Sequence, residues 1–149
     1  MRDGRRWRLK RKPKSMRKKL IDQLDKLASQ YIKMRDDHTC QKCGKRGVRS
    51  SSIHVSHVIP KSRGQRYRWE PNNMKCLCFH DHLQFWHLNP VEAGAWFMGK
   101  FPGRWAAIQE LPTGKMTVTD LEELRDWYIR AGENFDSDVP EDELGDILG

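Results

Sequence analysis

No run of apolar residues in this sequence approaches the roughly 18 to 20 residues that a helix needs to cross a bilayer. The basic N-terminus also lacks the apolar segment of a secretory signal peptide. We therefore expect a cytoplasmic protein whose thiols stay reduced. The sequence has only four cysteines, and in a reducing compartment such residues are metal ligands more often than disulfides.

Acidic residues are scarce at one end of the chain, and basic residues are absent from the other. Residues 1–19 contain eleven Lys or Arg and one Asp, whereas residues 133–149 contain seven Asp or Glu and no Lys or Arg. The formal net charge is +8 at pH 7. A basic arm over 1–13 is typical of proteins that bind nucleic acid, although such an arm can also act only as a solubilising segment. We expect the acidic tail to be disordered.

The candidate phosphate contacts in the arm are basic side chains that lie among few apolar ones. They are Arg5, Arg6, Arg8, Lys10, Arg11 and Lys12.

Residues 14–132 have the length of a single domain. Apolar residues recur at steps of three or four from Met16 to Met34, which predicts an amphipathic helix of about five turns with Ser15 as its N-cap. We expect the apolar stripe of this helix to belong to the core. A homodimer that forms through the same stripe is the alternative.

β-Branched residues and alternation predict a strand over 52–59. A basic loop over 60–68 follows, and then a return strand over 69–76 with Asn72 and Asn73 at a turn. Strands this close in sequence are expected to pair as a hairpin.

The rest of the domain is predicted to be helical. A short helix is expected over about 79–88, and Asn89 followed by Pro90 is typical of the start of another. Thr119 and Glu122 have the spacing of a capping box, which predicts that the last helix covers about 120–131.

The residue types that bind metals are concentrated in one part of the chain. Five of the six histidines lie between residues 54 and 87. Just ahead of them, Cys40 and Cys43 form a C-x-x-C pair followed by Gly44, which is the arrangement of a zinc knuckle. Structural zinc takes four ligands, so a second pair must come from elsewhere in the chain.

Read in order, this region contains Cys40-x-x-Cys43, Ser56-His57-Val58-Ile59-Pro60, Asn73, and Leu77-Cys78-x-x-Asp81-His82. The ordered pattern, over residues 38 to about 90, resembles the HNH nucleases of the ββα-metal (His-Me finger) superfamily. The resemblance implies an α+β fold in which a small zinc-stapled ββα-metal motif packs among helices, including the long N-terminal amphipathic helix. It also implies a metal-dependent endonuclease that hydrolyses phosphodiester bonds in DNA.

The start of the motif and its basic loop look closest to phage recombination nucleases of the NinG/Rap type. That narrower resemblance implies branched or recombination intermediates of phage DNA as substrates, and action in the host cytoplasm if the chain is phage-encoded.

The resemblance also implies roles for individual residues. His57 matches the general base, Asn73 the residue that ties down the loop, and His82 a ligand of a catalytic Mg²⁺ or Mn²⁺. The residue before the base is often a second metal ligand, but here it is Ser56, a poor one. His54 on the same face of the strand and His87 are the alternatives to Ser56 for that ligand.

For the structural Zn²⁺, the resemblance implies four ligands in two pairs. These are Cys40, Cys43, Cys78 and Asp81, with His80 or Cys76 as alternatives to Asp81. A carboxylate is an accepted zinc ligand.

Basic residues between the two strands complete the expected DNA site. They are Lys61, Arg63, Arg66 and Arg68. A non-catalytic zinc-stabilised DNA-binding protein is the rival hypothesis, and an RNA nuclease is a third.

Overall fold

The computed structural model describes residues 12–47 and 52–135. Ten elements follow in chain order: α1 (Met16–Arg35), β1 (Ile53–His57), η1 (Lys61–Arg63), α2 (Gln65–Arg68), η2 (Pro71–Asn73), β2 (Met74–Cys78), η3 (Asp81–His87), α3 (Pro90–Lys100), α4 (Pro102–Gln109) and α5 (Val118–Glu133). Most of the expected basic arm and acidic tail lies outside the described residues.

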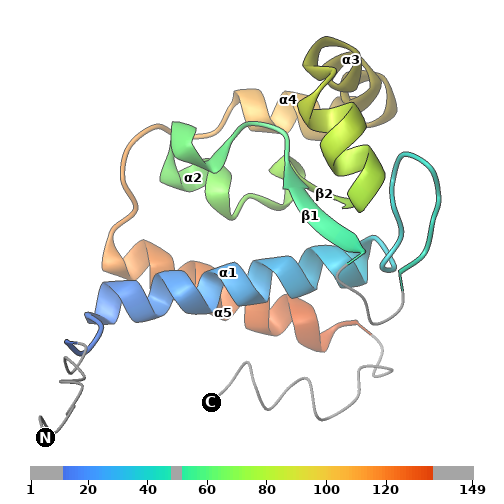
Figure 1. Cartoon of the computed structure of the whole chain (residues 1–149). Coiled ribbons are helices and arrows are strands. Elements are labelled where there is room, and N and C mark those ends of the chain that lie inside the picture. Colours follow the sequence, from blue (N-terminus) through green and yellow to red (C-terminus); the bar gives the residue numbers. More distant parts are fainter. Residues whose placement is uncertain (1–11, 48–51, 136–149) are drawn as a thin grey trace, which may run out of the picture.

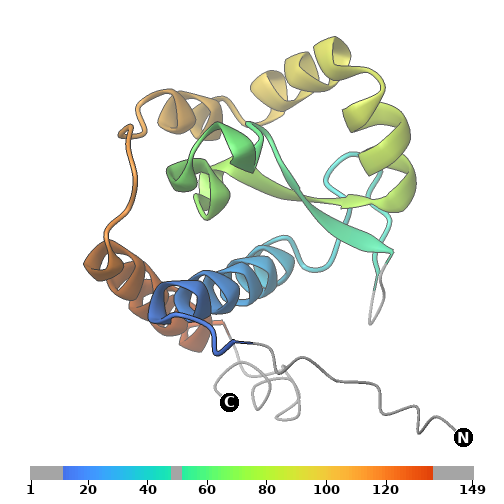
Figure 2. The same cartoon turned by 60° about the vertical axis from the view of Figure 1, so that its left-hand side comes forward.

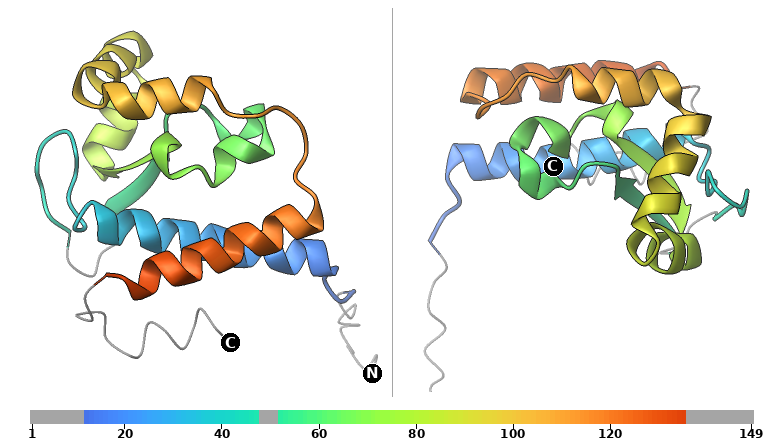
Figure 3. Two further views of the ribbon diagram at one scale, coloured as in Figure 1. Left: turned by 180° about the vertical axis from the view of Figure 1, so that it is seen from behind. Right: turned by 90° about the horizontal axis from the view of Figure 1, so that it is seen from above.

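The molecule has two layers (Figures 1 and 2). One layer consists of α1 and α5, which pack side by side along their length. The other contains the hairpin of β1 and β2 together with the shorter helices (Figure 3). The predicted α+β class is therefore confirmed: the protein is mostly helical, with a two-stranded antiparallel hairpin and a cysteine cluster beside it.

The long N-terminal helix forms as its periodicity predicts. The side chain of Ser15 caps α1 by accepting a hydrogen bond from the backbone N–H of Lys18 at 3.2 Å. Along its apolar stripe the helix buries Leu20, Leu24, Leu27, Ala28 and Ile32. These residues belong to the core of the same chain, which the hairpin and α5 complete. None of the helices in the described part of the chain is long and apolar enough to span a membrane.

The hairpin is shorter than expected and its second strand begins later. β1 pairs with β2 in antiparallel register from Ile53 opposite Cys78 to His57 opposite Met74. The return strand predicted over 69–76 is wrong at its start, because Pro71–Asn73 form a 3₁₀ turn capped by the side chain of Glu70. The segment expected to be a loop over 60–68 also contains two short helices, η1 and α2.

The two faces of β2 meet different partners. The Cys76 backbone N–H donates to Asp36 Oδ2 at 2.9 Å, and its thiol lies 3.7 Å from the carbonyl oxygen of Ile32, so this face packs on α1. Lys75 is on the opposite face, with its Nζ over the ring of Trp86 in η3. The hairpin is therefore packed between α1 and the η3–α3 region.

The last helix begins two residues earlier than predicted. Its capping box is formed by Thr117 and Asp120, whose reciprocal hydrogen bonds measure 3.1 and 2.7 Å, and not by Thr119 and Glu122. An aspartate reaches back to the cap as a glutamate does, so both spacings satisfy the pattern. Trp127, on this helix, is 40% exposed.

Candidate active site

Four metal-binding side chains converge beside the hairpin. The thiols of Cys40, Cys43 and Cys78 and a carboxylate oxygen of Asp81 all lie within 4.8 Å of one another. The sulfurs of Cys43 and Cys78 are 3.8 Å apart, and Asp81 Oδ2 is 3.2 Å from the sulfur of Cys40. Tetrahedral zinc with Zn–S bonds of about 2.3 Å separates its sulfur ligands by roughly 3.8 Å. The cluster is thus compatible with structural zinc.

Local backbone geometry brings the first pair of ligands together. The N–H of Gly44 donates to the carbonyl of Cys40 at 2.9 Å, and Gly44 has a φ of 79°, a conformation that glycine adopts readily. The second pair lies where β2 ends and η3 begins, with the N–H of Asp81 3.4 Å from the sulfur of Cys78. Burial raises the pKa of the Cys78 thiol, so a bound cation is what would stabilise thiolates here.

The two alternatives to Asp81 lie outside this cluster. Cys76 is on the face of β2 that packs on α1, and burial raises the pKa of its thiol to about 12. The side chain of His80 is 78% exposed, with Nδ1 3.5 Å from Asp81 Oδ1. The sequence left these three possibilities open, and the geometry favours the carboxylate.

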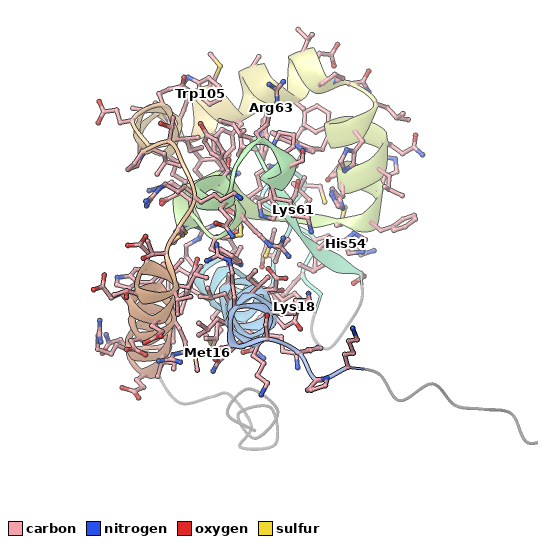
Figure 4. The ribbon with its side chains drawn as sticks, turned by 90° about the vertical axis from the view of Figure 1, so that its left-hand side faces the viewer. Met16, Lys18, His54, Lys61, Arg63 and Trp105 are labelled. Atoms are coloured by element: carbon pink, nitrogen blue, oxygen red, sulfur yellow. The ribbon has the colours of Figure 1, made fainter. Side chains whose placement is uncertain are left out.

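Three histidine side chains lie close together, one from the hairpin and two from the helix that follows it. His54 Nδ1 lies 3.0 Å from His82 Nδ1, and His87 Nε2 lies 3.1 Å from His82 Nε2. His54 comes from β1 (Figure 4), whereas the other two come from η3. η3 is a π-helix, whose i to i+5 hydrogen bonding brings residues five apart onto one face. Burial and the neighbouring histidines lower the pKa of His82 to about 4, so its imidazole is neutral and able to bind a metal ion at neutral pH.

Ser56 is directed elsewhere. It is 1% exposed, and its hydroxyl accepts a hydrogen bond from Lys75 Nζ at 3.1 Å. Lys75 is fully buried, lies 3.2 Å from the ring centroid of Trp86, and has its pKa pushed well below the ordinary value by burial. No motif in the sequence pointed to this lysine, because its position opposite Ser56 follows from the hairpin register that the structure shows.

His57 faces a cavity of about 450 Å³ between α1 and the hairpin, which Lys33 and Lys61 also line. Its Nε2 is 2.9 Å from the carbonyl oxygen of Arg68. A carbonyl can only accept, so Nε2 carries the proton and Nδ1 has the free lone pair. Burial lowers the pKa of His57 more than the hydrogen bond to Arg68 raises it, which keeps the ring neutral.

Asn73 connects the segment that follows His57 to the segment that precedes Arg68. Its Oδ1 accepts from the N–H of Ile59 at 2.8 Å, and its Nδ2 donates to the carbonyls of Ile59 and Tyr67 at 2.9 and 2.8 Å. The side chain is fully buried, and all of these bonds go to backbone groups. The amide therefore fixes the end of β1 against α2.

The basic residues between the strands differ in their surroundings. Lys61 and Arg63 are exposed (Figure 4). Arg66 lies 4.0 Å from Asp120, and Arg68 forms two hydrogen bonds with Asp25. In the arm, Lys12 is exposed, while Arg5, Arg6, Arg8, Lys10 and Arg11 lie outside the described residues.

A hairpin followed by a helix, with clustered histidines and a cysteine-rich metal cluster at its side, defines a ββα-metal motif. Residues 40–84 match the family model described as HNH endonuclease. This segment is an HNH endonuclease domain, and HNH nucleases are metal-dependent phosphodiester hydrolases that act on DNA. The match covers less than half of the chain and does not single out the NinG/Rap type. The searches of curated proteins and of solved structures found no significant match.

The cysteine cluster generates a prediction about stability. We expect the purified protein to contain about one zinc per chain, and Cys40→Ser to lose it, because metal binding contributes directly to folding. A loss of about 3 kcal/mol would lower Tm by roughly 12 °C in a domain of this size. Elemental analysis and thermal denaturation measure both effects.

Cys76→Ala is the matched control, because it removes a buried thiol that contacts Ile32 in α1 and lies outside the four-residue cluster. Zinc should stay bound in Cys76→Ala. Asp81→Cys should retain zinc or bind it more tightly. Zinc loss in Cys76→Ala together with zinc retention in Asp81→Ala would assign the fourth ligand to Cys76 instead.

Proposed function

We propose that this protein is a metal-dependent DNA endonuclease in which His57 activates the attacking water. The observation that carries the proposal is the hydrogen bond from His57 Nε2 to the carbonyl of Arg68, which leaves Nδ1 as the proton acceptor. A neutral imidazole with a pKa near or below neutrality is suited to general-base catalysis. The HNH match over the same segment supports this assignment.

A divalent ion would be bound by His82 together with His54 or His87. His54 Nδ1 lies 3.0 Å from His82 Nδ1, and His87 Nε2 lies 3.1 Å from His82 Nε2, so the two candidates approach different nitrogens of the His82 ring. Such an ion neutralises charge on the phosphate and stabilises the leaving 3′ oxygen. Mg²⁺ or Mn²⁺ is proposed as this ion.

The remaining residues of the site have supporting roles. Asn73 fixes Ile59, which follows His57, and Tyr67, which precedes the residue that His57 binds, so the base has a defined direction. Lys61 lines the cavity, and both Lys61 and Arg63 are exposed; they are proposed to contact phosphates, as are the arm residues. Branched or recombination intermediates are proposed as substrates, on the strength of the resemblance to phage recombination nucleases.

One observation favours the rival function, a zinc-stabilised DNA-binding protein without activity. Ser56 occupies the position of a common metal ligand and is turned toward Lys75 instead. A cleavage assay with and without Mn²⁺ or Mg²⁺, on linear, single-stranded and four-way-junction DNA and on RNA, separates the two functions. Metal-dependent cleavage supports the nuclease, and binding without cleavage supports the rival.

His57→Ala is expected to reduce cleavage by about 10²-fold or more while DNA binding stays near the wild-type level. In the wild-type protein, the acid limb of kcat/KM should have its midpoint below 6.5, because the lowered pKa keeps His57 unprotonated to lower pH. Initial rates across a pH series measure this. His38→Asn removes a histidine outside the site and is the control. Cleavage by His57→Ala within threefold of wild type would reject the assignment.

The choice between strand residues as ion ligands can be tested directly. His54→Ala should raise the Mn²⁺ concentration needed for half-maximal cleavage, because an imidazole beside His82 is lost. Ser56→Ala, two residues further along β1, should leave it unchanged. The opposite pair of results would place the ion at Ser56.

The double variant Lys61→Gln/Arg63→Gln should bind duplex DNA more weakly. If each side chain neutralises one phosphate, the log–log slope of affinity against salt should become shallower by about 1.8. Arg130→Gln, which removes an exposed charge from α5, should leave the slope unchanged. Fluorescence anisotropy at several salt concentrations measures it, and an unchanged slope in the double variant would move phosphate binding away from this segment.

A further inference from the structure

Asp25, on α1, accepts hydrogen bonds from two successive residues next to the candidate base. Arg68 donates to it twice, from Nε to Oδ1 at 2.9 Å and from Nη2 to Oδ2 at 2.6 Å. The indole Nε1 of Trp69 donates to Oδ1 at 2.8 Å. A planar guanidinium that donates to both oxygens of one carboxylate has a fixed orientation as well as a partner of opposite charge.

The backbone of the same two residues is bonded on its other side. The carbonyl of Arg68 accepts from His57 Nε2 at 2.9 Å, and the carbonyl of Trp69 accepts from the hydroxyl of Tyr128 on α5. Trp69 and Tyr128 are almost completely buried. Side chains from both long helices therefore hold Arg68 and Trp69, and the carbonyl of Arg68 contacts His57.

This support matters because α2 is very short. It consists of four residues, Gln65–Arg68, and so short a helix has little stability of its own. Arg68 is its last residue, and carbonyls at a helix C-terminus have no partner within the helix. The carbonyl of Arg68 is thus available to His57, but only an outside contact can hold it in place.

The carboxylate of Asp25 is ionised at neutral pH. Burial by itself would raise the pKa of Asp25, but the hydrogen bonds from Arg68 and Trp69 outweigh it and lower the pKa. The side chains of Asp25 and Arg68 are still 41% and 30% exposed. Ion pairs with this much exposure contribute little to stability, so an effect of the pair on cleavage can be separated from an effect on folding.

We propose that Asp25 is a positioning residue for the reaction: through Arg68 and Trp69 it fixes the carbonyl group that orients His57. The inference rests on the proposed role of His57 as the base. Asp25 lies outside residues 40–84, so α1 supplies a part of the site that the HNH segment does not contain.

The test compares two identical substitutions on one helix. Asp25→Asn keeps the shape of the side chain but cannot accept the two-pronged bond from Arg68. Asp22→Asn, one turn earlier, removes a carboxylate that pairs with the exposed Lys14 and Lys18. Asp25→Asn should reduce kcat by roughly 10- to 100-fold, the scale for residues that orient a reacting group, with KM and Tm close to wild type. Asp22→Asn should leave kcat unchanged.

A double-mutant cycle with His57→Ala identifies the route of the effect. If Asp25 acts through His57, Asp25→Asn should cause no further loss of cleavage in a His57→Ala background. An equal loss in both backgrounds, or an unchanged kcat in Asp25→Asn, would overturn the inference. Wild-type cleavage by His57→Ala itself would instead overturn the proposed function.

Arg68→Lys is a second route to the same answer if Asp25→Asn folds poorly. Lysine keeps the positive charge but cannot form the two-pronged hydrogen bond to Asp25, so kcat should again fall. In a His57→Ala background, Arg68→Lys should cause no further loss of cleavage. A change in KM alone would show that Arg68 binds substrate, and would reject the positioning role.

Discussion

A two-stranded hairpin is marginally stable in water, so the whole site depends on the contacts that clamp this one. The cluster of Cys40, Cys43, Cys78 and Asp81 is one of these contacts. It joins a loop after α1 to the point where β2 ends and η3 begins, and η3 carries two of the three clustered histidines. The clamp therefore sets the distance between the strand and the helix that a catalytic ion would bridge.

The second constraint comes from α1. Asp36, at its C-terminal end, accepts from the backbone of Cys76 in β2, and Asp25 binds Arg68 and Trp69 near the other end of the hairpin. One helix thus anchors both sides of the motif through carboxylates. This explains why a long helix that is not part of the matched segment packs directly beneath it (Figure 1).

Between the cysteine cluster and the contacts with α1, the hairpin contains a buried lysine next to a serine. At the position where a metal-binding residue is common, the strand has Ser56, and a buried Lys75 lies beside it over an aromatic ring. Burial of an amino group is costly unless the group is hydrogen-bonded or packed on a π-system, and Lys75 has both a hydroxyl and an indole beside it. The residue of β1 that lies beside His82 is His54, two residues before Ser56.

The sequence by itself determined the features that depend on local spacing. Steps of three and four residues between apolar positions predicted α1. The C-x-x-C-G motif predicted the first pair of cluster residues, and the order of His57, Asn73 and His82 predicted the family. Helix boundaries were not determined in this way, because Thr117 and Thr119 are both followed by an acidic residue three positions later, and the hydrogen bonds in the structure identify Thr117 as the cap. Tertiary structure alone decided that His54 and not Ser56 lies beside His82, that a π-helix brings His87 to His82, and that Asp25 binds Arg68 across 43 residues of chain. These depend on the packing of segments distant in sequence, which no local pattern records.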